Sequence, residues 1–215
     1  MPLVVFDLDG TLIDSKRDLA NAVNAMLEHF GRARLAVETV YSYVGNGAPV
    51  LVRRALGGEP SEQEAAEALQ FFYAYYREHM LDYTVAYPGV REALESLRES
   101  GARMAVLTNK PVRFSEEIVR GLELERYFFR VYGGNSFEYK KPHPVGIETL
   151  LKESGETKDG AWMVGDSAVD IKTARNAGIA AAGVTYGFQP ETLTADPPDL
   201  LLDDLRKFAA AILAS

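Results

Sequence analysis

Residues 3–11 read Leu3-Val4-Val5-Phe6-Asp7-Leu8-Asp9-Gly10-Thr11. The first four side chains form a short apolar run, which is typical of a parallel strand buried on both faces. Asp7 and Asp9 follow two positions apart and so share one side of an extended chain. Two carboxylates this close repel unless a cation or a proton lies between them, which favours a functional site. The alternative is a strand that ends in two solvated acids and a turn at Gly10.

Three similar apolar runs follow later in the chain, at residues 104–107, 162–164 and 181–184. Between and after these runs, apolar residues recur at helical spacing, as in residues 90–97 and 171–177. Strands that alternate with helices predict an α/β fold: a doubly wound parallel sheet with a Rossmann-like core.

Residues 15–85 break this alternation. Apolar residues at helical spacing recur within 19–30, 51–56 and 69–80, and no strand-like run of similar quality separates them. We therefore expect two domains. Residues 1–14 and 86–215 form the core, and residues 15–85 form an all-helical cap inserted after the first strand.

Composition excludes several classes of function. The chain of 215 residues has no cysteine, so that disulfides, thiolate metal sites and cysteine nucleophiles are absent. Its formal net charge of −8 and the lack of a basic stripe disfavour nucleic-acid binding. No apolar run is long enough to span a membrane, and the amino terminus does not resemble a signal peptide. We expect a cytoplasmic protein whose anionic substrate binds at a locally positive site.

Polar residues follow three of the expected strands. Asp7 and Asp9 follow the first, Thr108-Asn109 the second, and Asp166 and then Asp170 the third. Ligands of open α/β sheets bind at the carboxyl ends of the strands, so these residues are predicted to meet in one crevice. Three or four carboxylates form a hard oxygen site that suits Mg²⁺. For Asp166 and Asp170, the alternative role is to cap a helix.

Two further segments carry groups that suit phosphate. Short polar side chains and helix-start amides at Thr108-Asn109 can hold phosphate oxygens, although an ordinary helix cap would look the same. Lys141 lies in a proline-restricted segment, Lys140-Lys141-Pro142-His143-Pro144, where a fixed ammonium group would neutralise phosphate charge. The alternative is a solvated surface turn.

Four segments together resemble the motifs of the haloacid dehalogenase-like hydrolase superfamily, in order and in spacing, over essentially the whole chain. They are Asp7-Leu8-Asp9-Gly10-Thr11-Leu12-Ile13-Asp14-Ser15, Leu107-Thr108-Asn109, Lys141-Pro142-His143-Pro144 and Gly165-Asp166-Ser167-Ala168-Val169-Asp170. Within the superfamily the chain most resembles the phosphoglycolate phosphatases. That closer resemblance depends on residues 18–24, 44–48 and 184–188.

The resemblance implies an Mg²⁺-dependent phosphatase that hydrolyses a small phosphomonoester, 2-phosphoglycolate, through an aspartyl phosphate on Asp7. Asp9 would protonate the leaving oxygen and later activate water. Mg²⁺ would be held by Asp7, the backbone carbonyl of Asp9 and Asp166, with Asp170 supporting the metal shell. Thr108 and Lys141 would hold the transferring phosphoryl group, and Thr11 and Asn109 complete the expected substrate site.

The helical insert supplies candidates for the far end of the substrate. Arg53 and the turn Gly45-Asn46-Gly47 would meet it there, and an arginine pairs well with a carboxylate such as that of glycolate. A solvated position beside Arg54 is an equally good interpretation of Arg53.

Other functions use the same core. A pyrophosphatase, a nucleotidase and a sugar-phosphate mutase remain alternatives, and a noncatalytic binding protein is a weaker one because Asp7 and Asp9 are both present. A dehalogenase is disfavoured because those relatives lack the second acid that Asp9 provides. The sequence is compatible with a monomer or a homodimer, and a small phosphorylated metabolite is the expected partner.

Overall fold

The apolar run at residues 3–6 forms the fully buried strand β1 (Leu3–Phe6) in the computed structural model, which describes residues 2–213. Five more strands complete its sheet: β4 (Arg103–Leu107), β5 (Arg130–Tyr132), β6 (Trp162–Gly165), β7 (Ala180–Val184) and β8 (Leu200–Leu202). Their order is β5-β4-β1-β6-β7-β8, and each neighbouring pair is parallel. The parallel α/β fold that the sequence predicts is confirmed.

The two outer strands, β5 and β8, are absent from the sequence-based expectation. Each has three residues, and neither is fully buried: Arg130 is exposed at the start of β5, and Leu201 in the middle of β8 is 60% exposed. Edge strands have a neighbour on one side only, so they do not show the continuous apolar run that reveals a central strand.

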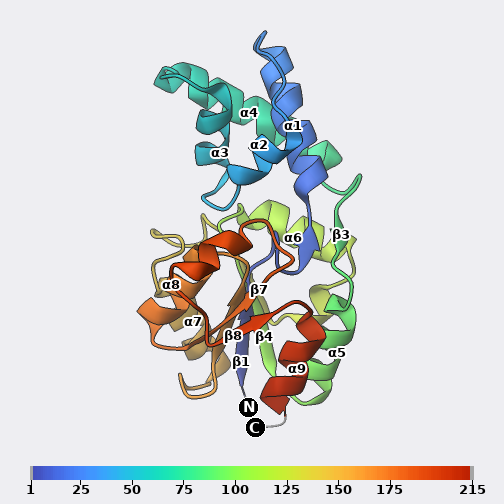
Figure 1. Ribbon diagram of the computed structural model, residues 1–215, viewed down its shortest axis with the longest axis vertical. Helices are drawn as coiled ribbons and strands as arrows, with labels where there is room; N and C mark the ends of the chain where they lie inside the picture. The colour runs from blue at the N-terminus through green and yellow to red at the C-terminus, as the bar shows by residue number, and fades with distance from the viewer. Residues whose placement is uncertain (1, 214–215) are drawn as a thin grey trace. The chain divides into compact units, whose positions relative to one another are not determined.

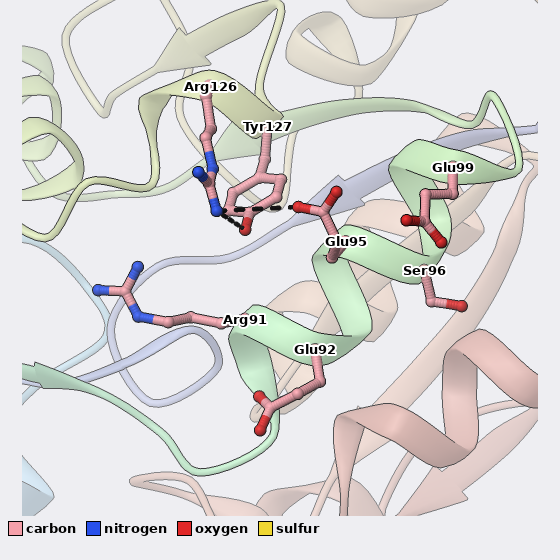
Figure 2. Close-up of a pocket in the computed structure, with 7 residues that line it drawn as sticks. All are labelled: Arg91, Glu92, Glu95, Ser96, Glu99, Arg126 and Tyr127. Atoms are coloured by element: carbon pink, nitrogen blue, oxygen red, sulfur yellow. Dashed lines mark hydrogen bonds and ion pairs between the residues drawn. The ribbon is translucent and has the colours of Figure 1, made fainter.

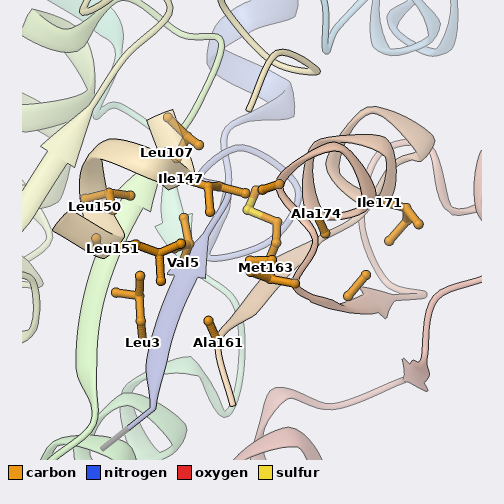
Figure 3. Close-up of a cluster of buried hydrophobic side chains, with 14 of the residues drawn as sticks. Leu3, Val5, Leu107, Ile147, Leu150, Leu151, Ala161, Met163, Ile171 and Ala174 are labelled. Atoms are coloured by element: carbon orange, nitrogen blue, oxygen red, sulfur yellow. The ribbon is translucent and has the colours of Figure 1, made fainter. Parts of the chain in front are cut away.

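Alternate residues of β1 supply two different cores. Leu3 and Val5 belong to a cluster between the sheet and two helices, α7 (Val145–Ser154) and α8 (Ala168–Ala177) (Figure 3). Phe6 faces the other way, and its ring meets Phe208 edge-on at 6.5 Å. Phe208 belongs to α9 (Leu205–Leu213), which packs against α5 (Val90–Glu99). Helices therefore cover both faces of the sheet (Figure 1), as period-2 burial of a central strand requires.

Three further elements complete this part of the chain: helix α6 (Val112–Gly121) and the 3₁₀ turns η1 (Glu125–Tyr127) and η2 (Pro190–Thr194). None of the helices between residues 2 and 213 combines the length and the apolar character needed to cross a membrane.

The chain divides into two compact units: the segments up to Asp14 and from Ala86 onward form the first, and Ser15–Val85 forms the second. The second unit contains α1 (Lys16–His29), α2 (Val37–Ser42), α3 (Ala48–Leu56) and α4 (Glu62–His79). Helix α4 packs against both α1 and α3. Ser61 caps α4 by accepting a 3.1 Å hydrogen bond from the Glu64 amide, so that this helix begins earlier than its apolar pattern indicates.

Asp18 joins the two ends of the second unit. This fully buried residue near the start of α1 accepts hydrogen bonds from the amides of Tyr83 and Thr84, at 3.0 and 2.8 Å, and from the Thr84 hydroxyl at 2.8 Å. Two short strands, β2 (Ile13–Asp14) and β3 (Val85–Ala86), pair with each other beside these ends. The segment therefore leaves and returns to the sheet through neighbouring strands.

Candidate active site

The candidate site lies at the carboxyl edge of the sheet, because the strands on either side of β1 carry the other polar motifs. Phe6 of β1 is in register with β4 on one side and with Val164 of β6 on the other. Asp7, Thr108 and Asp166 follow these strands and therefore reach the same edge. The Asp7 amide donates a 2.9 Å hydrogen bond to the Val164 carbonyl, which extends the β1–β6 pairing up to the first acidic residue.

Three carboxylates meet at this edge. Asp7, Asp166 and Asp170 each offer an oxygen, and these oxygens all lie within 4.8 Å of one another. All three side chains belong to buried residues, so little water screens their mutual repulsion. A compact set of carboxylate oxygens is what hard divalent cations such as Mg²⁺ prefer. The donor set therefore fits the metal that the sequence predicts.

Close backbone approach and hydrogen bonds hold two of these carboxylates in place. A Cβ atom at Gly165 would lie 2.2 Å from the Asp170 Cβ, so that only glycine fits there. Asp170 Oδ2 accepts a 2.7 Å hydrogen bond from the Ser167 hydroxyl at the start of α8. Asp166 Oδ2 accepts a 2.6 Å hydrogen bond from the Phe188 amide. Asp170 thus caps the helix and belongs to the acidic cluster at the same time.

Lys141 neutralises part of this cluster. Its ammonium nitrogen lies 2.8 Å from Asp7 Oδ1 and 2.6 Å from Asp170 Oδ1, and its side chain is 2% exposed. Burial alone would lower the Lys141 pKa, but the two neighbouring carboxylates raise it above its ordinary value. Lys141 is therefore a permanent buried cation beside Asp7, not a residue of a solvated surface turn.

Two of the acids keep unusually high pKa values without a metal ion. Burial, reinforced by the Asp170 charge and opposed by Lys141, raises the pKa of Asp7 to about 6. Burial and the charges of Asp170 and Asp7 raise the pKa of Asp166 to about 8. Both raised pKa values show that ionised carboxylates are unfavourable at this buried site. A bound cation would make the ionised forms more favourable.

Asp9 has a separate partner, Lys110, to which the sequence analysis assigns no role. The Lys110 ammonium nitrogen lies 3.1 Å from both carboxylate oxygens of Asp9. The exposed fractions of the two side chains are 5% and 12%. The only signal in the sequence is a lysine directly after the two polar residues that follow β4, and nothing there identifies its partner 101 residues away.

The charges at this edge do not balance. Among the described residues, the acids are Asp7, Asp9, Asp166 and Asp170, and the paired lysines are Lys110 and Lys141. When all are ionised, the acids exceed the lysines by two charges, which is the charge of one divalent cation. This excess agrees with the donor set in favouring a divalent metal ion.

The polar residues after β4 are also tied to the site. Asn109 donates a 3.2 Å hydrogen bond from its side-chain amide to the Lys141 carbonyl, and so links the segments that carry Thr108 and Lys141. The Thr108 hydroxyl accepts a 3.2 Å hydrogen bond from the Lys110 amide. Thr11 is fully buried, and its hydroxyl oxygen has no hydrogen-bond partner among the described residues.

The remaining candidates lie in the second unit. Gly45 and Gly47 both have positive φ, at 110° and 87°, which suits glycine at these two positions on either side of Asn46. Gly47 directly precedes α3. Arg53 lies on α3, where its guanidinium group forms an ion pair with the exposed carboxylate of Glu62.

A shallow hollow on the first unit involves none of these residues (Figure 2). It is lined by Arg91, Glu92, Glu95, Ser96, Glu99, Arg126 and Tyr127. Arg126 donates a 2.7 Å hydrogen bond to the Tyr127 hydroxyl and lies 3.8 Å from the Glu95 carboxylate. Arg126 and Glu95 form this ion pair in the open, which is typical of a solvated surface.

Comparison with known proteins assigns the chain to a family. The family described as "Haloacid dehalogenase-like hydrolase" matches residues 4–184. The chain belongs to this family. The resemblance carried by the four motifs is thereby confirmed, and the chain is a hydrolase and hence an enzyme.

Relatives of this hydrolase extend over almost its whole length. It is 44% identical to a phosphoglycolate phosphatase from Pseudomonas fluorescens strain Pf0-1, over 98% of this chain and 79% of the relative. It is 39% identical to one from Vibrio parahaemolyticus, over 99% and 96% of the two chains. A crystal structure titled as a predicted phosphoglycolate phosphatase, from Haemophilus somnus 129PT, has a TM-score of 0.92 at 33% identity and covers 98% of this chain and 97% of its own.

Proposed function

We propose that this hydrolase is an Mg²⁺-dependent phosphatase that removes phosphate from a small monoester by way of an aspartyl phosphate on Asp7. The observation that carries the proposal is the position of Asp7 between Lys141 and a cluster of buried acids. A carboxylate can approach a phosphate dianion only where cations offset the repulsion between the two. Lys141 supplies one such cation, and the acidic cluster supplies the ligands for another.

Asp7, Asp166 and the backbone carbonyl of Asp9 are the proposed ligands of Mg²⁺. Asp170 supports them through its contacts with Lys141 and Ser167. When bound, Mg²⁺ supplies Lewis-acid polarisation of the phosphoryl oxygens and neutralises the excess negative charge.

The chain's own residues divide the reaction into two displacements. In the first, a carboxylate oxygen of Asp7 forms a bond to phosphorus, the bond to the leaving oxygen breaks, and Asp9 gives that oxygen a proton. In the second, Asp9 takes a proton from water as the water oxygen attacks phosphorus and the bond to Asp7 breaks. The products are an alcohol and inorganic phosphate, and both aspartates return to their starting state. Thr108, Asn109 and Lys141 orient the phosphoryl group.

The proposed substrate is 2-phosphoglycolate. Support comes from the names of relatives that align over nearly the full length of this chain. We assign the helical unit of residues 15–85 the role of a cap that selects the leaving group, with residues 45–47 and Arg53 meeting the glycolate carboxylate. Arg53 would exchange its ion pair with Glu62 for that carboxylate, which is the same type of charge-assisted contact.

A substrate panel tests the proposal. Purified protein is assayed with 2-phosphoglycolate, pyrophosphate, nucleoside monophosphates and hexose phosphates, in Mg²⁺ and in EDTA, with Asp7→Asn as the inactive reference. The expected result is the highest kcat/KM on 2-phosphoglycolate, no turnover in EDTA and recovery when Mg²⁺ is restored. Higher specificity for pyrophosphate or a nucleotide would reassign the substrate, and unchanged turnover by Asp7→Asn would refute the covalent mechanism.

A further inference from the structure

Lys110 and Asp9 form a buried ion pair, and the proposed reaction assigns no role to Lys110. Asp9 lies three residues beyond the end of β1 and Lys110 three residues beyond the end of the neighbouring strand β4. The lysine nitrogen is 3.1 Å from each carboxylate oxygen of Asp9, so that it bridges both of them. Contact with both oxygens centres the ammonium group on the carboxylate, and so fixes the direction in which the Asp9 side chain points.

Burial makes the pairing costly to break. With its side chain 5% exposed, the Lys110 ammonium group has little access to water and depends on anionic or polar partners at this edge of the sheet. Lys141 does not compete for Asp9, because its own contacts are to Asp7 and Asp170. Each of the two acids that follow β1 thus has its own buried lysine, contributed by a different segment of the chain.

We propose that Lys110 is the positioning residue of Asp9, and that it holds this carboxylate where it exchanges protons with the leaving oxygen and with the attacking water. The proposal rests on the proposed function, in which Asp9 performs both proton transfers. Lys141 by contrast serves the nucleophile and the phosphoryl group. The two lysines should therefore affect different steps of the same reaction.

A good leaving group separates those steps. p-Nitrophenolate departs from phosphorus without a proton, so formation of the aspartyl phosphate from p-nitrophenyl phosphate does not need Asp9. The hydrolysis that follows does need it, because water must lose a proton. Removing Lys110 should consequently slow the second step and spare the first.

Rapid mixing with p-nitrophenyl phosphate in saturating Mg²⁺ measures both steps. We expect Lys110→Met to release about one equivalent of p-nitrophenolate in a fast burst, followed by steady turnover roughly 10- to 100-fold slower than that of the unmodified enzyme, since misplacing a catalytic group costs on this order. Lys141→Met should lose the burst as well. Lys172→Met, which removes an exposed lysine of α8, is the matched control and should behave as the unmodified enzyme.

A double variant distinguishes positioning from a separate role. If Lys110 acts through Asp9, then Asp9→Asn with Lys110→Met should turn over within about threefold of Asp9→Asn alone, because a residue that positions an absent group adds nothing. Multiplied defects would overturn the proposal. Lys110→Gln, which keeps a hydrogen-bond donor, is measured in parallel; it should show the same pattern with a smaller defect, so that a folding failure of the methionine variant does not end the test.

Two other outcomes would also overturn the assignment. Unchanged turnover in Lys110→Met would show that the pair has no part in the reaction, and equal loss of the burst and of the steady rate would move Lys110 to the phosphoryl group. Neither outcome touches the proposed function, which is tested separately by Asp7→Asn, by EDTA and by the substrate panel.

Discussion

Lys141→Met tests most directly how much the Lys141 ammonium group stabilises the buried carboxylates of this site. The substitution keeps a long apolar side chain but removes the ammonium group that lies 2.8 Å from Asp7 and 2.6 Å from Asp170. Both carboxylates would then remain buried beside Asp166 without a cation in the metal-free protein. The expected result is a protein that folds but is markedly less stable.

The magnitude follows from the geometry. Each contact is worth roughly 6 kcal/mol at an effective dielectric constant of about 20, before the cost of burying the charges is subtracted. Removing one partner of a buried ion pair typically costs about 3–5 kcal/mol after that subtraction. For a chain of this length each kcal/mol lowers the melting temperature by about 2–4 °C, so we expect a drop of roughly 6–20 °C.

Thermal and urea denaturation in EDTA, followed by circular dichroism, measure this loss. The destabilisation should be larger at pH 8 than at pH 5, because at low pH the uncompensated carboxylates take up protons instead. Adding Asp170→Asn should restore part of the stability, since it removes one of the unpaired charges and keeps an oxygen that can accept from Ser167. Lys172→Met, on an exposed position of α8, controls for the loss of a positive charge.

A loss below about 1 kcal/mol in Lys141→Met, equal to that of the control, would refute this reasoning. It would mean that water reaches the two carboxylates or that they move apart. A double variant less stable than Lys141→Met would likewise show that Asp170 stabilises the fold through Ser167 more than it destabilises it through its charge.

Three further predictions concern catalysis, pH and substrate choice. Asp9→Asn should keep its fold and lower turnover of 2-phosphoglycolate by roughly 10²–10⁴-fold in steady-state assays, the usual contribution of a general acid and base; less than a tenfold loss would contradict that role. In EDTA, the melting temperature should fall as pH rises from about 4 through 8, because the raised pKa values of Asp7, about 6, and Asp166, about 8, make the folded state bind protons more tightly than the unfolded state. Mg²⁺ replaces those protons and should stabilise the protein more at pH 8 than at pH 5; equal gains at both values would argue against a metal at these acids. Arg53→Ala should lower kcat/KM for 2-phosphoglycolate by roughly ten- to a hundredfold and leave p-nitrophenyl phosphate unaffected, whereas Glu62→Ala, which removes only its ion-pair partner, should not lower it.

The amino-acid sequence by itself determined the centre of the fold and the type of chemistry. β1, β4, β6 and β7 are buried beyond their first residue, so the pattern of each strand is local: an apolar run, with polar or glycine residues at or just after its end. The rule that ligands bind at carboxyl ends then brings Asp7, Thr108 and Asp166 to one edge without any coordinates. The acidic cluster of Asp7, Asp166 and Asp170 in the structure agrees with that inference.

Only the tertiary structure decided which charges are neighbours. The pairing of Lys110 with Asp9 depends on β4 lying next to β1. The double contact of Lys141 depends on how the segment before α7 approaches both the loop after β1 and the first turn of α8. β5 and β8 could not be predicted from the sequence, because a short, partly exposed edge strand does not show a continuous apolar run. A side chain's local sequence determines its type and the element that carries it, whereas its ion-pair partner is set by strand order and packing across residues distant in the chain.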